Sequence, residues 1–197
     1  MRLKDLLSFV LCVACVPTLA HASKKNVLPD ACGADDIEFN LTPASGLPLS
    51  SPIPDGKARI VFIESYDKPG MLQTGMLTGG KKFVTRFGMD GAWVGAAGGN
   101  NYFSVDVAPG EHKLCASVKG KKEYVGMDSV TAEVGKTYYY DAKYDFESSA
   151  VSTYGGGTNG MSSGRVVHYD AAYSVLKEDE GKFRVKSSEP VTSAPAK

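Results

Sequence analysis

The segment Thr137-Tyr138-Tyr139-Tyr140-Asp141-Ala142-Lys143-Tyr144-Asp145-Phe146 carries the strongest secondary-structure signal in this chain of 197 residues. Apolar or aromatic residues occupy every second position, namely Tyr138, Tyr140, Ala142, Tyr144 and Phe146. Successive side chains of a β-strand point to opposite faces of a sheet, so this alternation predicts a strand with one face toward a core. The chain is therefore expected to be built around β-strands.

Strand signals recur on the N-terminal side of this segment. Turn residues separate them, above all Asp90-Gly91, which is typical of a β-hairpin. Strands spaced about 8 to 12 residues apart predict an all-β domain, an antiparallel β-sandwich of the Ig-like or prealbumin-like kind, over residues 57–186. The predicted strands before the segment lie at 58–63, 83–89, 92–95, 102–107, 113–118 and 130–134.

The sequence after the segment predicts less regular structure. A Gly- and Ser-rich loop spans 148–164, and a strand-like region follows at 165–176. A polar turn at 178–181 leads to a short strand-like piece at 183–185. Residues 187–197 are rich in Ser, Pro and Ala and are expected to form a loose, flexible tail.

The first 22 residues have the pattern of a secretory signal. Arg2 and Lys4 form a basic start, the run 6–16 is nearly all apolar, and Ala20-His21-Ala22 is a small-x-small cleavage site. The apolar run is too short for a membrane anchor, which needs about 20 residues. We therefore expect cleavage after Ala22 and a periplasmic or secreted protein.

The residues beyond the signal contain no stretch that is long and apolar enough to span a membrane. Lipid anchoring at Cys15 is disfavoured, because Cys12 stands where such sites prefer Leu. Residues 23–56 are rich in Pro, Ser, Gly and Asp, which predicts an extended N-terminal segment.

Removal of the signal leaves two cysteines, Cys32 and Cys115, in a compartment that permits disulfides. A bridge between them closes a loop of about 80 residues and contributes on the order of 4 kcal/mol by chain-entropy reckoning. Two separate buried thiols are the alternative. The polar surroundings of Cys32 favour the bridge, which would tether residues 23–56 to the sandwich. His112 and His168 lack zinc spacing relative to these cysteines, so no metal site and no cofactor are predicted.

Charge excludes one class of partner. The chain has 22 Lys and Arg against 22 Asp and Glu, and its sequence pI is about 6.8. A neutral chain lacks the positive field that nucleic-acid binding requires, so no nucleic-acid partner is expected.

Two glycine-rich motifs lack the context that their chemistry needs. Gly160-Met161-Ser162-Ser163-Gly164 fits the nucleophile elbow of hydrolases, which would make Ser162 the nucleophile. No helix pattern follows it, and no histidine lies beyond His168 to complete a triad. The run 155–160 fits a dinucleotide fingerprint but also lacks its helix. Both motifs are interpreted as parts of a flexible loop.

Aromatic and amide residues suggest a ligand site. Trp93 and Tyr102 could form a platform for a glycan or peptide, with Asn100 and Asn101 at its edge, because such sites combine aromatic faces with hydrogen-bonding groups. Packing of Trp93 in the core is the alternative, and the pattern alone leaves both open.

Several motifs occur in an order shared with one protein family. From about residue 31 to residue 185 the chain resembles uncharacterised bacterial exported proteins catalogued as domain of unknown function twenty-eight forty-six. The resemblance implies a secreted or lipoprotein β-domain of the envelope with its two cysteines paired, and it implies no reaction. The motifs are Ala31-Cys32-Gly33, Ile37-Glu38-Phe39, Asp55 to Phe62, Met89 to Gly95, Asn101-Tyr102-Phe103, Val107 to His112 with Cys115, and Val134 to Tyr140.

The sequence thus predicts a non-catalytic exported envelope protein whose β-domain serves structure or protein interaction. Its expected partner is another envelope protein or a cell-wall component. A glycan- or peptide-binding module built on Trp93 and Tyr102 is the first alternative. A hydrolase that uses Ser162 is the second, and its missing context disfavours it.

Overall fold

The computed structural model describes residues 28–34, 37–44, 49, 51–66, 84–119, 123–154 and 161–196. The predicted signal lies outside these residues. The secondary-structure elements are β1 (Phe39–Pro43), β2 (Ala58–Tyr66), β3 (Thr85–Met89), β4 (Ala92–Ala97), β5 (Asn101–Val107), β6 (Gly110–Lys119), β7 (Glu123–Ala132), β8 (Thr137–Tyr154), β9 (Met161–Leu176), α2 (Glu178–Lys186) and β10 (Glu189–Pro195).

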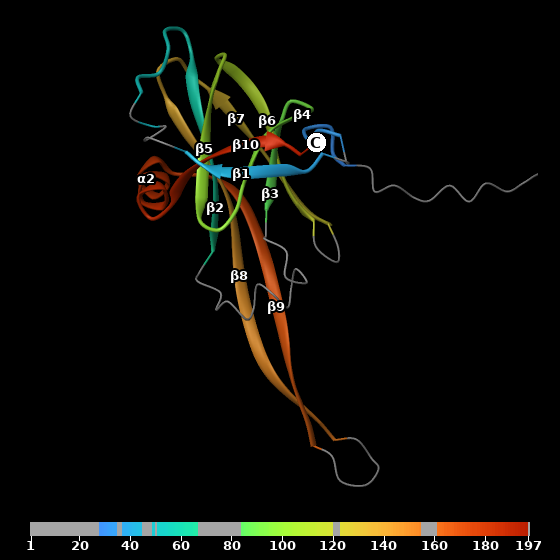
Figure 1. Ribbon diagram of the computed structural model, residues 1–197. Helices are drawn as coiled ribbons and strands as arrows, with labels where there is room; N and C mark the ends of the chain where they lie inside the picture. The colour runs from blue at the N-terminus through green and yellow to red at the C-terminus, as the bar shows by residue number, and fades with distance from the viewer. Residues whose placement is uncertain are drawn as a thin grey trace, which may run out of the picture.

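The strands form two sheets that pack face to face (Figure 1). One has six strands in the order β1-β10-β5-β2-β8-β9, and the other has four in the order β4-β3-β6-β7. The predicted all-β sandwich is confirmed. Two pairings, β10 with β5 and β2 with β8, are parallel, and the others are antiparallel. The parallel pairs join strands far apart in sequence, which alternation within single strands does not reveal.

Aromatic side chains fill the space between the sheets. Phe62 of β2 is fully buried and stacks on Phe103 of β5 with ring centroids 5.1 Å apart. Phe87 of the four-stranded sheet lies 5.3 Å from the Phe62 ring, and Tyr140 of β8 meets the same ring edge-on at 6.2 Å. The residues that the alternation of β8 assigned to the core, Tyr140, Ala142 and Tyr144, are fully buried there.

The outer face of the six-stranded sheet is also covered, by helix α2. Val61, Ile63, Tyr102 and Tyr139 form a second apolar cluster on that face, and Val185 of the helix packs against it. The helix lies close to the sheet because a Cβ at Gly181 would come within 2.1 Å of the Tyr139 ring. Both faces of β2 are therefore buried.

Two predictions for the C-terminal region were wrong. The strand-like piece expected at 183–185 belongs to α2, whose acidic first turn and basic last turn suit the helix dipole. The tail expected to be loose at 187–197 forms β10, which pairs with β1 along Phe39–Pro43 and with the start of β5. The predicted extended N-terminal segment thus supplies a strand, β1, whose only described partner is this C-terminal strand.

The Asp90-Gly91 hairpin is confirmed between β3 and β4. Both residues adopt positive φ angles, 52° for Asp90 and 88° for Gly91. This conformation is the one that two-residue hairpin turns require, and it explains why Asp and Gly stand there.

The loop expected at 148–164 is mostly strand. β8 extends to Tyr154 and β9 begins at Met161, and their antiparallel register runs without a break from Tyr139 opposite Leu176 to Tyr154 opposite Met161. Figure 1 shows the two strands extending from the rest of the sandwich as a long ribbon. We call the two sheets without this extension, together with α2, the body. We call residues 145–154 and 161–170 the ribbon.

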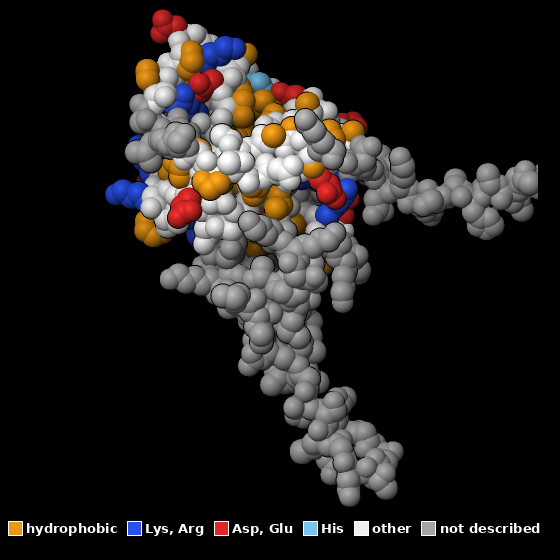
Figure 2. All heavy atoms as spheres, in the orientation of Figure 1, with side chains coloured by type: hydrophobic (Ala, Val, Ile, Leu, Met, Phe, Trp, Pro, Cys, Tyr) orange, Lys and Arg blue, Asp and Glu red, His pale blue; other side chains and the backbone are white. Residues whose placement is uncertain are grey.

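The described surface carries charges of both signs. In Figure 2, Lys and Arg side chains lie among Asp and Glu side chains over the visible face of the body. No helix in the described part of the chain is long and apolar enough to cross a membrane.

Candidate functional site

The predicted disulfide between Cys32 and Cys115 is confirmed. It joins residues 83 positions apart, with their Cα atoms 5.3 Å from each other. Cys115 lies on the outer face of β6, opposite the core residues Leu114 and Ala116, and is fully buried. The N-terminal segment covers it, so both faces of β6 are shielded at this point.

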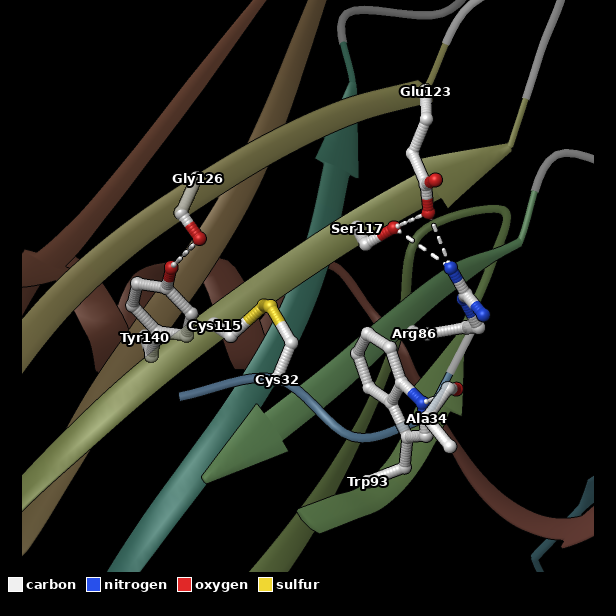
Figure 3. Close-up of a disulfide and its surroundings, with 9 residues drawn as sticks. All are labelled: Cys32, Ala34, Arg86, Trp93, Cys115, Ser117, Glu123, Gly126 and Tyr140. Carbon is white, nitrogen blue, oxygen red and sulfur yellow. Dashed lines mark hydrogen bonds and ion pairs between the residues drawn. A yellow bond between two sulfur atoms is a disulfide. The ribbon is translucent and has the colours of Figure 1, made fainter. Parts of the chain in front are cut away.

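Residues 28–34 form a strap across the outer face of the four-stranded sheet (Figure 3). The Gly91 N–H donates to the Ala31 carbonyl over 3.2 Å. Two glycines permit this close approach: a Cβ at Gly33 would lie 2.3 Å from the Trp93 ring, and one at Gly88 would lie 3.0 Å from Cys32 Cα. The strap is therefore seated by close packing as well as by the disulfide.

Trp93 is a packing residue for the strap. Its indole N–H donates to the Ala34 carbonyl, and the Arg86 guanidinium lies 4.4 Å from the centre of its ring. Figure 3 shows the indole beside the disulfide and the Arg86 side chain. Trp93 is half-buried, as the strap and Arg86 cover much of its surface.

Arg86 is a nearly buried cation with several partners. It forms an ion pair with Glu123 of β7 and donates to the Ser117 hydroxyl over 3.0 Å and to the Ile37 carbonyl over 3.2 Å. The Ser117 hydroxyl in turn donates to Glu123 over 2.6 Å. These contacts join β3, β6 and β7 to the N-terminal segment, which is the arrangement that a buried charge needs in order not to destabilise the fold.

The structure does not bring Trp93 and Tyr102 together. Trp93 stands on the outer face of the four-stranded sheet, whereas Tyr102 is buried under α2 on the six-stranded sheet. Asn100 lies in the turn between β4 and β5, and its φ of 62° helps to carry the chain from one sheet to the other. Asn101 begins β5 opposite Glu189. One platform made from both aromatic residues is therefore not formed.

His112 holds the β3–β4 hairpin. Its Nδ1 lies 2.7 Å from the Asp90 carboxylate and its Nε2 lies 2.9 Å from the Ala108 carbonyl, so both ring nitrogens face acceptors. Partial burial lowers the pKa of His112, but the contacts with Ala108 and Asp90 outweigh this and raise it above the ordinary value. These contacts tie the β3–β4 turn to the start of β6.

A shallow pocket of about 340 Å³ lies beside this hairpin. Its described lining residues are Asp30, Asp90, Glu111 and Lys113. Asp90 is already occupied by His112 and by the Lys113 N–H at 2.9 Å. Among the residues that the structure describes, no group of three His, Cys, Asp or Glu side chains is placed to hold a metal ion.

Glu64 is a fully buried carboxyl group at the junction of the sheets. It accepts hydrogen bonds from the Thr85 N–H at 3.1 Å and from the Gly99 N–H at 3.0 Å. Burial raises the pKa of Glu64 to about 8, although these hydrogen bonds oppose the rise. Glu64 thus links β2 of one sheet to β3 of the other, and the sequence signals it only as a lone acid at the end of an apolar run.

Asp141 lies under α2 on the opposite face of the six-stranded sheet. The Ser65 hydroxyl donates to its carboxylate over 2.8 Å. Burial raises the pKa of Asp141 to about 6, against the effects of Ser65 and of the positive charge on Arg184. The alternation in β8 placed this residue away from the core but gave no sign that a helix would cover it.

Ser162 lies inside β9, at the register position opposite Thr153. A nucleophile elbow places its serine at a turn between a strand and a helix, and the backbone here is a continuous antiparallel strand. The glycine run 155–160 lies outside the described residues. The backbone around Ser162 therefore gives no support to the hydrolase alternative.

The ribbon is the most distinctive feature of the structure. β2 pairs with β8 only as far as Tyr66 opposite Tyr144, and past this point β8 and β9 pair with each other alone among the described residues. A two-stranded ribbon without further support is marginally stable in water. Its edges, which no described strand covers, make it a candidate site for pairing with another chain.

Comparisons of the chain with models of known families, with curated proteins and with solved structures find no match. The family resemblance therefore stays a prediction that rests on the motifs alone.

Proposed function

We propose that this chain is a non-catalytic β-sandwich protein of the bacterial envelope that binds another protein through the ribbon. One observation carries the proposal. Ten residues of β8 and ten of β9 continue their pairing past the last strand of the body, where the described residues offer them no other partner. A chain that keeps this length of strand outside its own sheet presents backbone N–H and C=O groups for strand addition.

The disulfide and the signal pattern support the envelope as the location. A buried bridge that tethers the strap to β6 suits an oxidising compartment, because thiols stay reduced in the cytosol. The basic start, apolar run and Ala20-His21-Ala22 site would direct the chain there. Strand addition needs no catalytic group, which fits a protein whose recognisable motifs lack the context for chemistry.

The observations favour the ribbon over the aromatic platform. Trp93 is engaged by the strap and Arg86, and Tyr102 is buried under α2. A glycan or peptide ligand would have to displace the strap in order to reach the whole indole face. Binding at Trp93 alone stays a prediction, and tryptophan fluorescence in the presence of cell-wall fragments would test it.

Site-specific photocrosslinking in a Gram-negative host tests the proposed function. A photoreactive amino acid placed at Ser149, in the ribbon, should give a covalent adduct with another polypeptide chain, either a different protein or a second copy, after irradiation. The matched control is Thr131, which is exposed on β7 of the body and should give none. Fractionation of the same cells should place the chain in the periplasm without its leader.

Two results would count against the proposal. A chain that stays in the cytoplasm with its leader intact would overturn the location. Equal adduct yields at Ser149 and Thr131, or no adduct at either position, would remove the ribbon as the binding element.

A further inference from the structure

β9 is an edge strand of the six-stranded sheet. Near its C-terminal end, contacts with β7 cover its outer edge. There the Val175 N–H donates over 2.9 Å to the carboxylate of Asp128, which belongs to β7 of the other sheet. Tyr173 of β9 packs against Gly126 of β7, because a Cβ at Gly126 would come within 2.0 Å of the Tyr173 ring. Within the described part of the chain, no strand pairs with the outer edge of β9 along residues 161–170 (Figure 1).

The hydrogen bond of Val175 also shows which residues of β9 direct their backbone N–H and C=O groups away from β8. An N–H that donates to Asp128 does not donate to β8, so Tyr140 and Val175 are a pair without mutual hydrogen bonds. The register between β8 and β9 is unbroken, and the two kinds of pair alternate along it. The backbone N–H and C=O groups of Val167 and Arg165 therefore point away from β8, toward the free edge.

This edge carries little of the usual protection against pairing. Proteins guard exposed edges with Pro, with charged side chains, especially Lys, or with very short strands. The segment Met161-Ser162-Ser163-Gly164-Arg165-Val166-Val167-His168-Tyr169-Asp170 contains no Pro and no Lys, and Arg165 and Asp170 are its charged residues at neutral pH. It is a long edge that no described strand covers, and it is therefore a candidate for strand addition.

We propose that a second copy of this chain pairs antiparallel with β9 along residues 162–170, with the two-fold axis at Val166. This inference rests on the proposed function and names the partner of the same ribbon. A two-fold axis perpendicular to the sheet makes the pairing self-complementary, so one patch serves both copies. The product is a four-stranded sheet in the order β8-β9-β9-β8.

Geometry and charge select this register. A two-fold axis perpendicular to the sheet keeps each residue on its own face, so only positions of the same parity can stand opposite each other. Of the registers that keep the pairing within 161–170, the longest are centred on Arg165 and on Val166. The first sets Arg165 against Arg165 and is disfavoured, because like charges directly opposite destabilise a sheet. The second sets Val166 against Val166 and Arg165 against Val167.

A single-cysteine scan of the exported chain tests the register. The native cysteines are paired, so an introduced cysteine supplies the reactive thiol. Val166 is the pair that lacks mutual hydrogen bonds, for which Cα atoms lie about 4.5 Å apart, within disulfide range. Val166→Cys should form a covalent dimer under mild oxidation. Ser162→Cys is the matched control, since its two copies would lie about 26 Å apart, eight residues along the strand.

A proline variant tests the backbone pairing itself. Val167→Pro removes an N–H that points to the second copy and that β8 does not use. Sedimentation velocity should show a dimer for the wild-type chain and a monomer for Val167→Pro, with the same thermal midpoint of the body. A monomeric wild type, or equal crosslinking of Val166→Cys and Ser162→Cys, would overturn the inference.

Different results would contradict binding through the ribbon and the identity of its partner as a second copy. A monomeric chain that still gives a Ser149 adduct with a different protein would remove the second copy as the partner and leave the proposed function standing. A monomeric chain without any adduct would remove both.

Discussion

Two parts of one continuous hairpin, β8–β9, have opposite surroundings. Over 137–144, β8 lies between β2 and β9, and the side chains of Tyr140, Ala142 and Tyr144 are fully buried. Over 145–154, the same strand pairs with β9 alone among the described residues. The backbone pairing is the same in both parts. The comparison teaches that a hydrogen-bond ladder extends a strand, whereas neighbours on its faces and edges make it part of a stable body.

The largest expected effect lies in the core of the body. Phe62→Ala would remove the ring that Phe103, Phe87 and Tyr140 all contact, and the free energy of unfolding should fall by about 3 to 5 kcal/mol. Urea denaturation followed by circular dichroism would measure it. A loss below about 1 kcal/mol would mean that the core packing described for the body is incorrect.

Loss of the disulfide should have the next largest effect. The double variant Cys32→Ala and Cys115→Ala should lose about 2 to 4 kcal/mol of stability, because the bridge closes a long loop in the unfolded chain. Limited proteolysis should then cut the strap before the strands. A variant whose strap resists protease as well as the wild type does would show that Trp93 and the two close-packed glycines hold the strap unaided.

Glu64 should make the body more stable in mild acid. Its pKa of about 8 lies above the ordinary value of 4.5, so the folded state binds more protons than the unfolded state between these values. Stability should therefore rise by about 2 kcal/mol as the pH falls from 7 to 5.5. Thermal melts of the wild type and of Glu64→Gln should differ in this slope. Parallel pH profiles for the two proteins would show that Glu64 is not the cause.

A smaller effect is expected at the hairpin turn. Asp90→Asn would weaken the contact with His112, whose pKa should fall toward its ordinary value. A raised histidine pKa adds stability below the unfolded value of about 6.5 and loses it as the pH rises through the folded value, so the variant should lose about 1 kcal/mol at pH 5.5 and less at pH 8. An NMR titration of His112 would measure the pKa shift, and an unchanged value would contradict the assignment.

The smallest effect is expected in the ribbon. Val151→Ala in the monomeric background of Val167→Pro should change the free energy of unfolding of the body by less than about 0.5 kcal/mol, because no third strand pairs with this part of β8 in the described structure. Hydrogen exchange should likewise be fast at 145–154 and slow at 137–144 in that background. Equal protection of both parts would contradict the comparison.

The sequence predicted the core strands of the body better than it predicted helix α2. Alternation located the strands around Phe62, Phe103 and Tyr140, and Asp90-Gly91 located a turn, because burial on one face leaves a period of two in the sequence. Helix α2 escaped prediction, since Glu178 to Gly181 contains three acids and a glycine, a composition that also suits a turn. Its position depends on Tyr139, which is distant in sequence.

The candidate site was only partly predictable. The disulfide followed from counting cysteines, because the mature chain would hold only two. The separation of Trp93 from Tyr102 did not follow, since Asn100 carries the chain to the other sheet where a simple hairpin would have kept both residues on one. The ribbon was predicted only in part: residues 165–170 were expected to form a strand, whereas 148–154 and 161–164 were assigned to a loop because the stretch 148–164 is rich in Gly and Ser.

The pairing of β1 with β10 sets the point in synthesis at which one edge of the six-stranded sheet is able to form. Phe39 lies opposite Pro195, so this edge stays incomplete until the ribosome has made the residues of β10. Contacts between residues this far apart form slowly, because a large loop must close before they are gained. This edge of the sheet is therefore among the last parts of the described structure to form.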